Sequence, residues 1–244
     1  MNFIQKFLAA RRLKRIFGAH VDPERIDGLV GSDAGAEGTA RECEITPFFA
    51  TVCGYVGIAE QLPLALLPEL MNGYYAACTA AIETNGGALD KFVGDSVVAM
   101  FGAPTFQRDH ALRACLAALD LQERMDGLRV RFATEPGKWP ACVQDFHVRI
   151  GIHTGTAIVG NMGTVTRFNF SMMGDNVNLA ARLEKYAATY GVPILCSRAT
   201  KHACDVASPG RIRFRPLGCV EITGRTEPLE IFEPVSRQQG AAIA

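Results

Sequence analysis

The apolar positions of the chain follow two periods that alternate along its length. Three segments carry an apolar residue every three to four positions, as one face of a helix requires. They are residues 62–84, 109–125 and 175–190. Other segments carry the apolar runs of strands. They are residues 44–52, 88–101, 144–163, 192–196, 211–222 and 229–235, with a short helix expected near 197–204.

Turn-forming residues separate these segments. Asn85-Gly86-Gly87 is typical of a helix end, and Gly94-Asp95 pinches residues 88–101 into a predicted hairpin. Thr154-Gly155 divides residues 144–163 in the same way. Asp175 is the expected N-cap of the third helix, and residues 127–140 are expected to form a loop.

The order of elements predicts an α+β fold. It begins β-α-β-β-α-β, the ferredoxin-like arrangement, and adds a helix and C-terminal strands. We expect this domain to span residues 44–235. Residues 1–43 are predicted to be a basic amphipathic helix and a linker, and residues 236–244 a frayed tail.

Composition narrows the function. The chain has 25 Lys+Arg and 25 Asp+Glu, and this balance argues against a nucleic-acid binder. Residues 1–18 are basic and amphipathic, so they are expected to pair with an upstream or partner helix, or alternatively to lie on an anionic membrane. No apolar run reaches the ~18–20 residues that span a bilayer. The eight cysteines form no CxxC pair, so we expect reduced thiols and a cytoplasmic location.

Two pairs of polar residues are candidates for chemistry. Asp95 at the hairpin tip can reach a metal ion or be an ordinary turn aspartate. Lys91, on the same strand face, either meets an acceptor or is solvated. Asn178 and Arg182 share a helical face and suit a ribose and a phosphoryl group, or form a solvated face.

Three blocks in order resemble the catalytic domain of class III adenylyl and guanylyl cyclases. They are DKFVGDSVVAMFG at 90–102, RIGIHTG at 149–155 followed by VGN at 159–161, and GDNVNLAARLE at 174–184. The resemblance covers about residues 44–235. It implies a head-to-tail dimer in which the ribose 3′-hydroxyl of ATP attacks the α-phosphorus, assisted by two Mg²⁺ or Mn²⁺ ions.

The resemblance assigns roles by position. Asp95 matches a metal-binding aspartate. Lys91 matches the base-reading lysine of adenylyl cyclases, and Ser171 the second base-reading position. Asn178 matches the ribose-orienting residue, and Arg182 the arginine that stabilises the transition state.

The sequence departs from the family at two positions. Thr51 stands where the family has its first metal-binding aspartate, so the metal site is expected to be weakened. Thr223 stands at the expected triphosphate lysine, and Arg225 is the candidate substitute.

Three functions stay open. In the first, the chain is an adenylyl cyclase with impaired activity. In the second, it is an inactive cyclase-like module that dimerises and binds nucleotide, and in the third, it is one half of a heterodimer whose other chain brings both aspartates.

Overall fold

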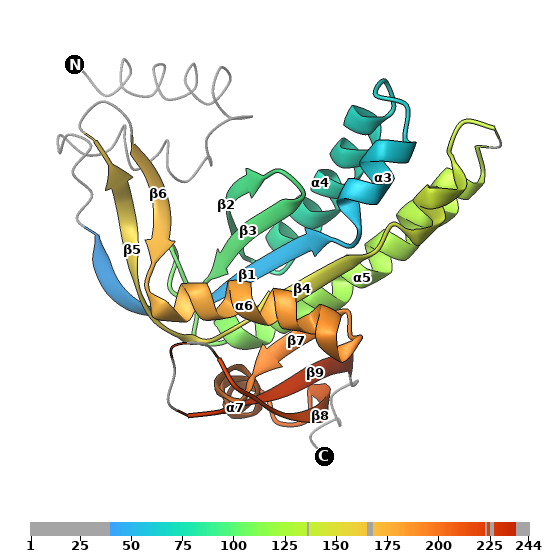
Figure 1. Cartoon of the computed structure of the whole chain (residues 1–244). Helices are drawn as coiled ribbons and strands as arrows, with labels where there is room; N and C mark the ends of the chain where they lie inside the picture. The colour runs from blue at the N-terminus through green and yellow to red at the C-terminus, as the bar shows by residue number, and fades with distance from the viewer. Residues whose placement is uncertain (1–39, 136, 165–167, 223, 225–226, 238–244) are drawn as a thin grey trace. The chain divides into compact units, whose positions relative to one another are not determined.

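The computed structural model describes residues 40–135, 137–164, 168–222, 224 and 227–237 (Figure 1). The chain divides into two compact units. One comprises Glu42–Val159 and Met172–Ala244, and the other Met1–Arg41 and Gly160–Ser171. The predicted leader and tail lie outside the described residues except for their last and first few positions. Among the described helices, none is long and apolar enough to cross a membrane.

Four strands of the larger unit form the predicted ferredoxin-like sheet. They are β1 (Arg41–Val52), β2 (Ala88–Val93), β3 (Ser96–Phe101) and β4 (Val148–Ile152). Their spatial order is β2-β3-β1-β4, and β1 is antiparallel to both β3 and β4. The α+β prediction is therefore confirmed. The sheet continues through β7 (Ile194–Ser197), parallel to β4, to β9 (Leu229–Arg237) and β8 (Ile212–Val220).

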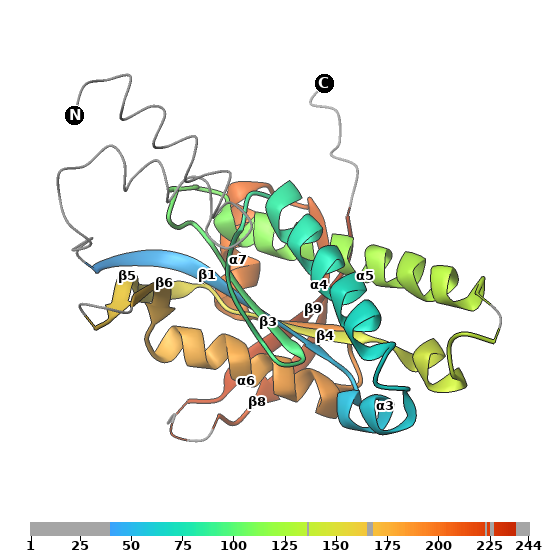
Figure 2. The same cartoon turned by 90° about the horizontal axis from the view of Figure 1, so that it is seen from above.

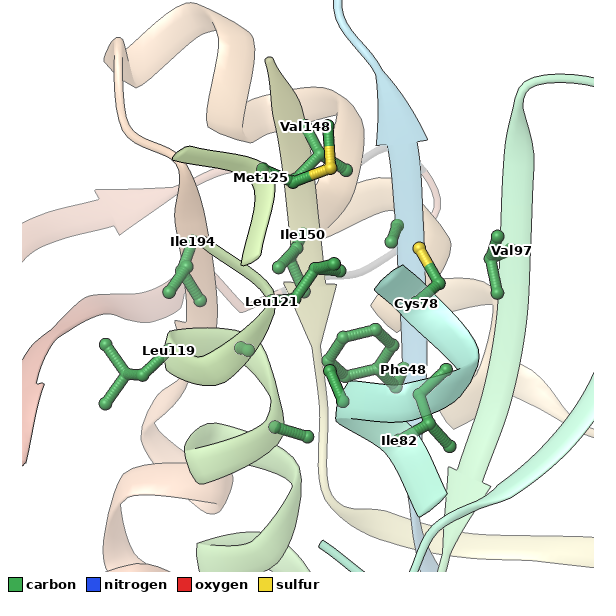
Figure 3. Close-up of a cluster of buried hydrophobic side chains, with 14 of the residues drawn as sticks. Phe48, Cys78, Ile82, Val97, Leu119, Leu121, Met125, Val148, Ile150 and Ile194 are labelled. Carbon is green, nitrogen blue, oxygen red and sulfur yellow. The ribbon is translucent and has the colours of Figure 1, made fainter. Parts of the chain in front are cut away.

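Two long helices cover one face of this sheet. Alternate residues of β1, β3 and β4 point toward α4 (Leu67–Thr84) and α5 (His110–Ala133). In Figure 3, Val148 and Ile150 of β4 face Leu121 and Met125 of α5. This apolar layer fixes the strands whose ends carry the candidate site residues.

A third helix covers the opposite face. Figure 2 shows α6 (Asp175–Tyr190) across the sheet from α4 and α5. Gly151 of β4 permits this packing, because a Cβ there would lie 2.2 Å from the Glu184 nitrogen and 2.3 Å from the Ala180 oxygen. Leu179, Leu183 and neighbours form a second apolar cluster with β7, β8 and β9. The helix is thus seated directly on the sheet backbone. The short helix α7 (Arg198–Ala207) follows β7.

The predicted helix of residues 62–84 was wrong at its N-terminal end, because residues 62–66 are not helical and α4 begins at Leu67. A separate helix that was not predicted, α3 (Tyr55–Gln61), precedes them. Pro63 and Pro68 explain the break, because proline lacks the N–H that a helix interior needs and suits the first turn.

The second helix is longer than predicted. It runs through Gly127 to Ala133, where a loop was expected. Leu128 and Phe132 are buried in this extension, and the Phe132 ring lies 4.4 Å from that of Trp139. Their burial offsets the ~1 kcal/mol cost of a helical glycine.

Three smaller expectations also differ. The strands of residues 144–163 form no hairpin: β5 (Gly155–Gly163) pairs with β1 and with the unpredicted β6 (Phe168–Met173), since both edges of β4 are occupied. The N-cap of α6 is Gly174, with φ 146°, so Asp175 is the first helical residue. Strand β1 begins at Arg41, inside the predicted linker.

Candidate active site

The two positions expected to bind metal lie together at one end of the sheet. Thr51 of β1 is the register partner of Ser96 of β3, and their hydroxyl oxygens are 2.9 Å apart. Asp95 precedes Ser96, and its carbonyl oxygen accepts a hydrogen bond of 3.2 Å from the Val52 nitrogen. The Gly94-Asp95 turn is therefore tied to the end of β1, with Thr51 and Asp95 as near neighbours.

Thr51 also faces a buried carboxylate. Glu184 of α6 is 5% exposed, and its Oε1 lies 3.2 Å from the Arg149 Nε. Burial raises the pKa of Glu184, whereas Arg149 and a hydrogen bond from Thr51 oppose that rise. A carboxylate only accepts, so Thr51 donates to Glu184 and accepts from Ser96. The single proton of the Thr51 hydroxyl is thus donated to Glu184.

These residues suit a divalent ion only in part. Within the residues that the structure describes, no three His, Cys, Asp or Glu side chains are grouped to hold a metal. Asp95 is half-buried at the turn and is the carboxylate available there. Since Mg²⁺ binds proteins through one or two carboxylates plus substrate phosphates, the donor set fits an ion brought with a triphosphate and not a pre-formed pair of ions.

The hairpin that carries Asp95 also carries Lys91. Lys91 is exposed on β2, and its Nζ lies 3.3 Å from Oδ2 of Asp90, a side chain that is only 2% exposed. Tyr75 of α4 donates a 2.6 Å hydrogen bond to the Gly94 carbonyl and packs on the Phe92 ring at 4.5 Å. Helix α4 thereby fixes the hairpin and presents Lys91 at the surface.

The second pair of predicted residues lies on α6. The predicted helix is confirmed, and its spacing of four residues places Asn178, which is exposed, one turn before Arg182, which is half-buried. The helix seats on β4 and β7, which β1 separates from the hairpin of Lys91 and Asp95 in the strand order. The two pairs therefore occupy different parts of one chain.

Two further predicted residues belong elsewhere. Ser171 is buried on β6 and belongs to the smaller unit. Arg225, like Thr223, lies outside the described residues. Their proposed contacts with base and triphosphate stay predictions.

Sequence reasoning missed Glu184 and Arg149. A signal for Glu184 was present, because it follows Ala180 by four positions and so falls on the apolar stripe of α6. A charged residue on such a stripe requires a buried partner. Arg149, on β4 opposite Thr51, is that partner.

The sequence and the fold agree with one family. Residues 39–232 match the profile of the adenylate and guanylate cyclase catalytic domain. Adenylate cyclase 1 of Rhizobium meliloti (strain 1021) is 32% identical over 220 residues, which cover 90% of this chain and 31% of that protein. The chain likewise spans 39% of the adenylate cyclase of Anabaena cylindrica, so it corresponds to a minor part of these relatives.

Solved structures give the same result. The adenylyl cyclase CyaB from P. aeruginosa is 28% identical with a TM-score of 0.72, and the match covers 84% of this chain and 100% of that one. The guanylyl cyclase Cya2 is 26% identical with a TM-score of 0.70, covering 82% and 95%. The chain belongs to the adenylate and guanylate cyclase catalytic domain family.

Proposed function

We propose that two copies of this chain convert ATP to 3′,5′-cyclic AMP and pyrophosphate at a site that they share. The observation that carries the proposal is that Asp95 and the pair on α6 lie on different elements of one copy. Asp95 occupies the β2–β3 turn, and Asn178 and Arg182 occupy α6 beyond β1. As the family resemblance implies, a second copy in head-to-tail orientation brings its Lys91, Asn178 and Arg182 to Asp95 of the first.

Each side chain has a separate task in this reaction. Lys91 donates to adenine N1, and the Ser171 hydroxyl accepts from the adenine amino group. Asn178 orients the ribose so that its 3′-oxygen forms a bond to the α-phosphorus while the bond to the pyrophosphate oxygen breaks. Arg182 offers its planar guanidinium to the charge that develops on the α-phosphoryl oxygens.

The metal side is expected to be weak. A Mg²⁺ or Mn²⁺ ion held by Asp95 would neutralise phosphate charge when bound. Thr51 brings no charge to that ion, and its hydroxyl already serves Glu184 and Ser96. We therefore propose a slow cyclase.

Apolar surface on the hairpin supports pairing with another cyclase domain. Phe92 is 44% exposed and Val93 is 55% exposed on β2, which ends the main strand order of the sheet. Exposed apolar side chains on an edge strand favour a protein partner.

A second candidate is a heterodimer with a chain that brings both aspartates. It is favoured because the pair on α6 is complete, whereas the metal side lacks a carboxylate.

Complementation between two inactive variants tests the shared site. Asp95→Asn removes the metal side and Arg182→Ala removes the partner side, so each homodimer is expected to be inactive. A mixture forms heterodimers in which one of two sites is complete. With random pairing we expect about a quarter of the wild-type rate of cyclic AMP formation.

The heterodimer candidate gives a different result. In that case, wild-type protein alone forms no cyclic AMP with Mg²⁺ or Mn²⁺. Activity appears when a second cyclase chain is added that has both metal-binding aspartates. In this second chain the arginine equivalent to Arg182 is replaced by alanine, so that it is inactive alone. A mixture of Asp95→Asn and Arg182→Ala that stays inactive, while wild type is active, would falsify the shared site.

A further inference from the structure

A row of polar side chains, all buried except the half-buried Asn176, crosses the larger unit and ends at the first turn of α6. It contains two imidazoles, an amide and four hydroxyls, none of which the proposed reaction uses. They are His110, Thr46, Thr154, Thr200, Ser197, His153 and Asn176. Buried hydroxyls cost free energy unless they are paired, so the row needs a physical account.

The end of the row at α6 fixes the direction of its hydrogen bonds. Asn176 Nδ2 donates to the Thr156 carbonyl at 2.8 Å, so its Oδ1 faces His153 and accepts from His153 Nε2 at 3.0 Å. In a neutral imidazole, Nδ1 then accepts from the Ser197 hydroxyl at 2.7 Å.

The next hydrogen bonds of the row run in the same direction. Because the Ser197 hydroxyl donates to His153, it accepts from the Thr200 hydroxyl at 3.2 Å. Thr200 in turn accepts from the Thr154 hydroxyl at 3.2 Å. Thr154 also pairs with Thr46 at 2.9 Å, and Thr46 pairs with His110 Nδ1 at 2.7 Å. From Thr154 to Asn176 each hydroxyl donates toward α6, an alignment in which the bonds polarise one another.

Asn176 is seated tightly at the end of this row. A Cβ on Gly155 would lie 2.7 Å from Asn176 Cγ, so the amide rests directly on the glycine backbone. The amide therefore ties the second residue of α6 to the start of β5 and, through His153, to the end of β4. Asn178 lies two residues further along the helix and Arg182 six.

We propose that His153 is a positioning residue that acts through Asn176 to hold the N-terminal turns of α6, and with them Asn178 and Arg182, in register with the sheet. The expected effect on reaction rate rests on the proposed cyclase function. The structural link between His153, Asn176 and α6 is independent of that function.

Asn176→Ala tests the link, with Thr46→Val as the matched control. Both remove buried hydrogen bonds of the same row, but Thr46 lies at the end remote from α6. We expect Asn176→Ala to speed amide hydrogen exchange between Asn178 and Arg182, and Thr46→Val to leave exchange there unchanged. A displaced catalytic group costs on the order of 10- to 100-fold in rate, so we expect that loss of kcat for Asn176→Ala.

The KM for ATP separates positioning from general damage. Lys91 lies on the hairpin, so Asn176→Ala is expected to leave KM within about twofold. Thr46→Val is expected to keep both constants within about twofold at a temperature where both variants are folded. The double variant of His153→Ala and Asn176→Ala is expected to be no slower than His153→Ala alone, because both act along one path.

Two results overturn the proposal. One is unchanged exchange between Asn178 and Arg182 in Asn176→Ala. The other is a loss of kcat in Thr46→Val equal to that in Asn176→Ala, which would make the row a stabilising core only. If wild type makes no cyclic nucleotide in any pairing, the proposed function fails, and the exchange measurement still decides whether Asn176 holds the helix.

Discussion

The two halves of the candidate site differ in how completely they are equipped. On α6, Asn178 and Arg182 are both present, and the helix that carries them packs on Gly151 and is tied to β5 near its N-terminus by the Asn176 amide. At the end of β1, Asp95 is present, and Thr51 stands where the family resemblance places a second carboxylate. In the proposed site, the side assigned to the ribose and phosphate is therefore complete, and the metal side lacks one ligand.

The surroundings of Thr51 show why that loss is compatible with a stable fold. Burial already raises the pKa of Glu184, and the cations Arg149 and Lys185 only partly oppose that rise. An aspartate at position 51 would place a second carboxylate against Glu184. Threonine instead donates a hydrogen bond to it, so the substitution relieves repulsion when no metal is present.

The largest expected effect tests the better equipped half. Arg182→Ala removes the guanidinium from the developing phosphoryl charge, and we expect the rate of cyclic AMP formation to fall by about 10²- to 10³-fold. Lys185→Ala is the matched control, because Lys185 is an exposed cation on the same helix. Equal rates for Arg182→Ala and wild type would show that Arg182 of α6 takes no part in the reaction.

The next effect tests the weaker half. Thr51→Asp restores a second carboxylate beside Asp95, and we expect the rate with Mg²⁺ to rise about 10-fold or more, because removing a divalent-ion contact costs several kcal/mol of transition-state stabilisation. Without metal, the new charge next to Glu184 is expected to lower the melting temperature, and Mg²⁺ with ATP to restore it.

Thr51→Asn separates charge from shape in this experiment. Asparagine has nearly the size of aspartate but no charge, so neither the gain in rate nor the metal-dependent melting is expected. A rate for Thr51→Asp no higher than for Thr51→Asn would show that the missing carboxylate is not what limits the chain.

Much of the fold could be predicted from the sequence where local signals are strong. The Gly94-Asp95 turn placed β2 and β3, and the apolar period of residues 175–190 placed α6. The predictions failed where tertiary packing overrides a local signal. Gly127 suggested a loop, but burial of Leu128 and Phe132 keeps the helix intact, and no local pattern shows that the edges of β4 are taken by β1 and β7.

The candidate site divides in the same way. Spacing alone placed Asn178 and Arg182 on one face of α6, because four residues make about one helical turn. The pair of Arg149 and Glu184 joins residues 35 positions apart, and the contact of Thr51 with Ser96 joins residues 45 apart. Such contacts depend on how the strands are aligned in the sheet, and this alignment cannot be inferred from either residue alone.

A smaller effect concerns which base the hairpin reads. Lys91→Glu replaces a donor by an acceptor that suits guanine, and we expect the ratio of kcat/KM for ATP over GTP to fall about 10-fold or more, the value of one base-specific pair of hydrogen bonds. Lys91→Met is the control, since it removes the donor and adds no acceptor. In Lys91→Met, activity with ATP should fall and activity with GTP should not rise. An unchanged ratio of kcat/KM for ATP over GTP in Lys91→Glu would show that Lys91 does not select the base.

The smallest effect concerns His110, at the end of the hydrogen-bonded row remote from α6. Burial lowers the pKa of His110 from its ordinary value of 6.5, and Glu44, whose Oε1 is 3.5 Å from Nε2, only partly opposes the shift. The fold therefore favours the neutral ring, so stability present above pH 6.5 is lost as the pH falls below it, when the unfolded chain takes up the proton first.

Urea unfolding between pH 7.5 and 5.5 measures this loss, and we expect the unfolding free energy of the wild type to fall over that range. His110→Gln cannot titrate, so the difference in unfolding free energy between wild type and variant should shrink as the pH falls. Parallel curves would show that His110 contributes nothing to the pH dependence.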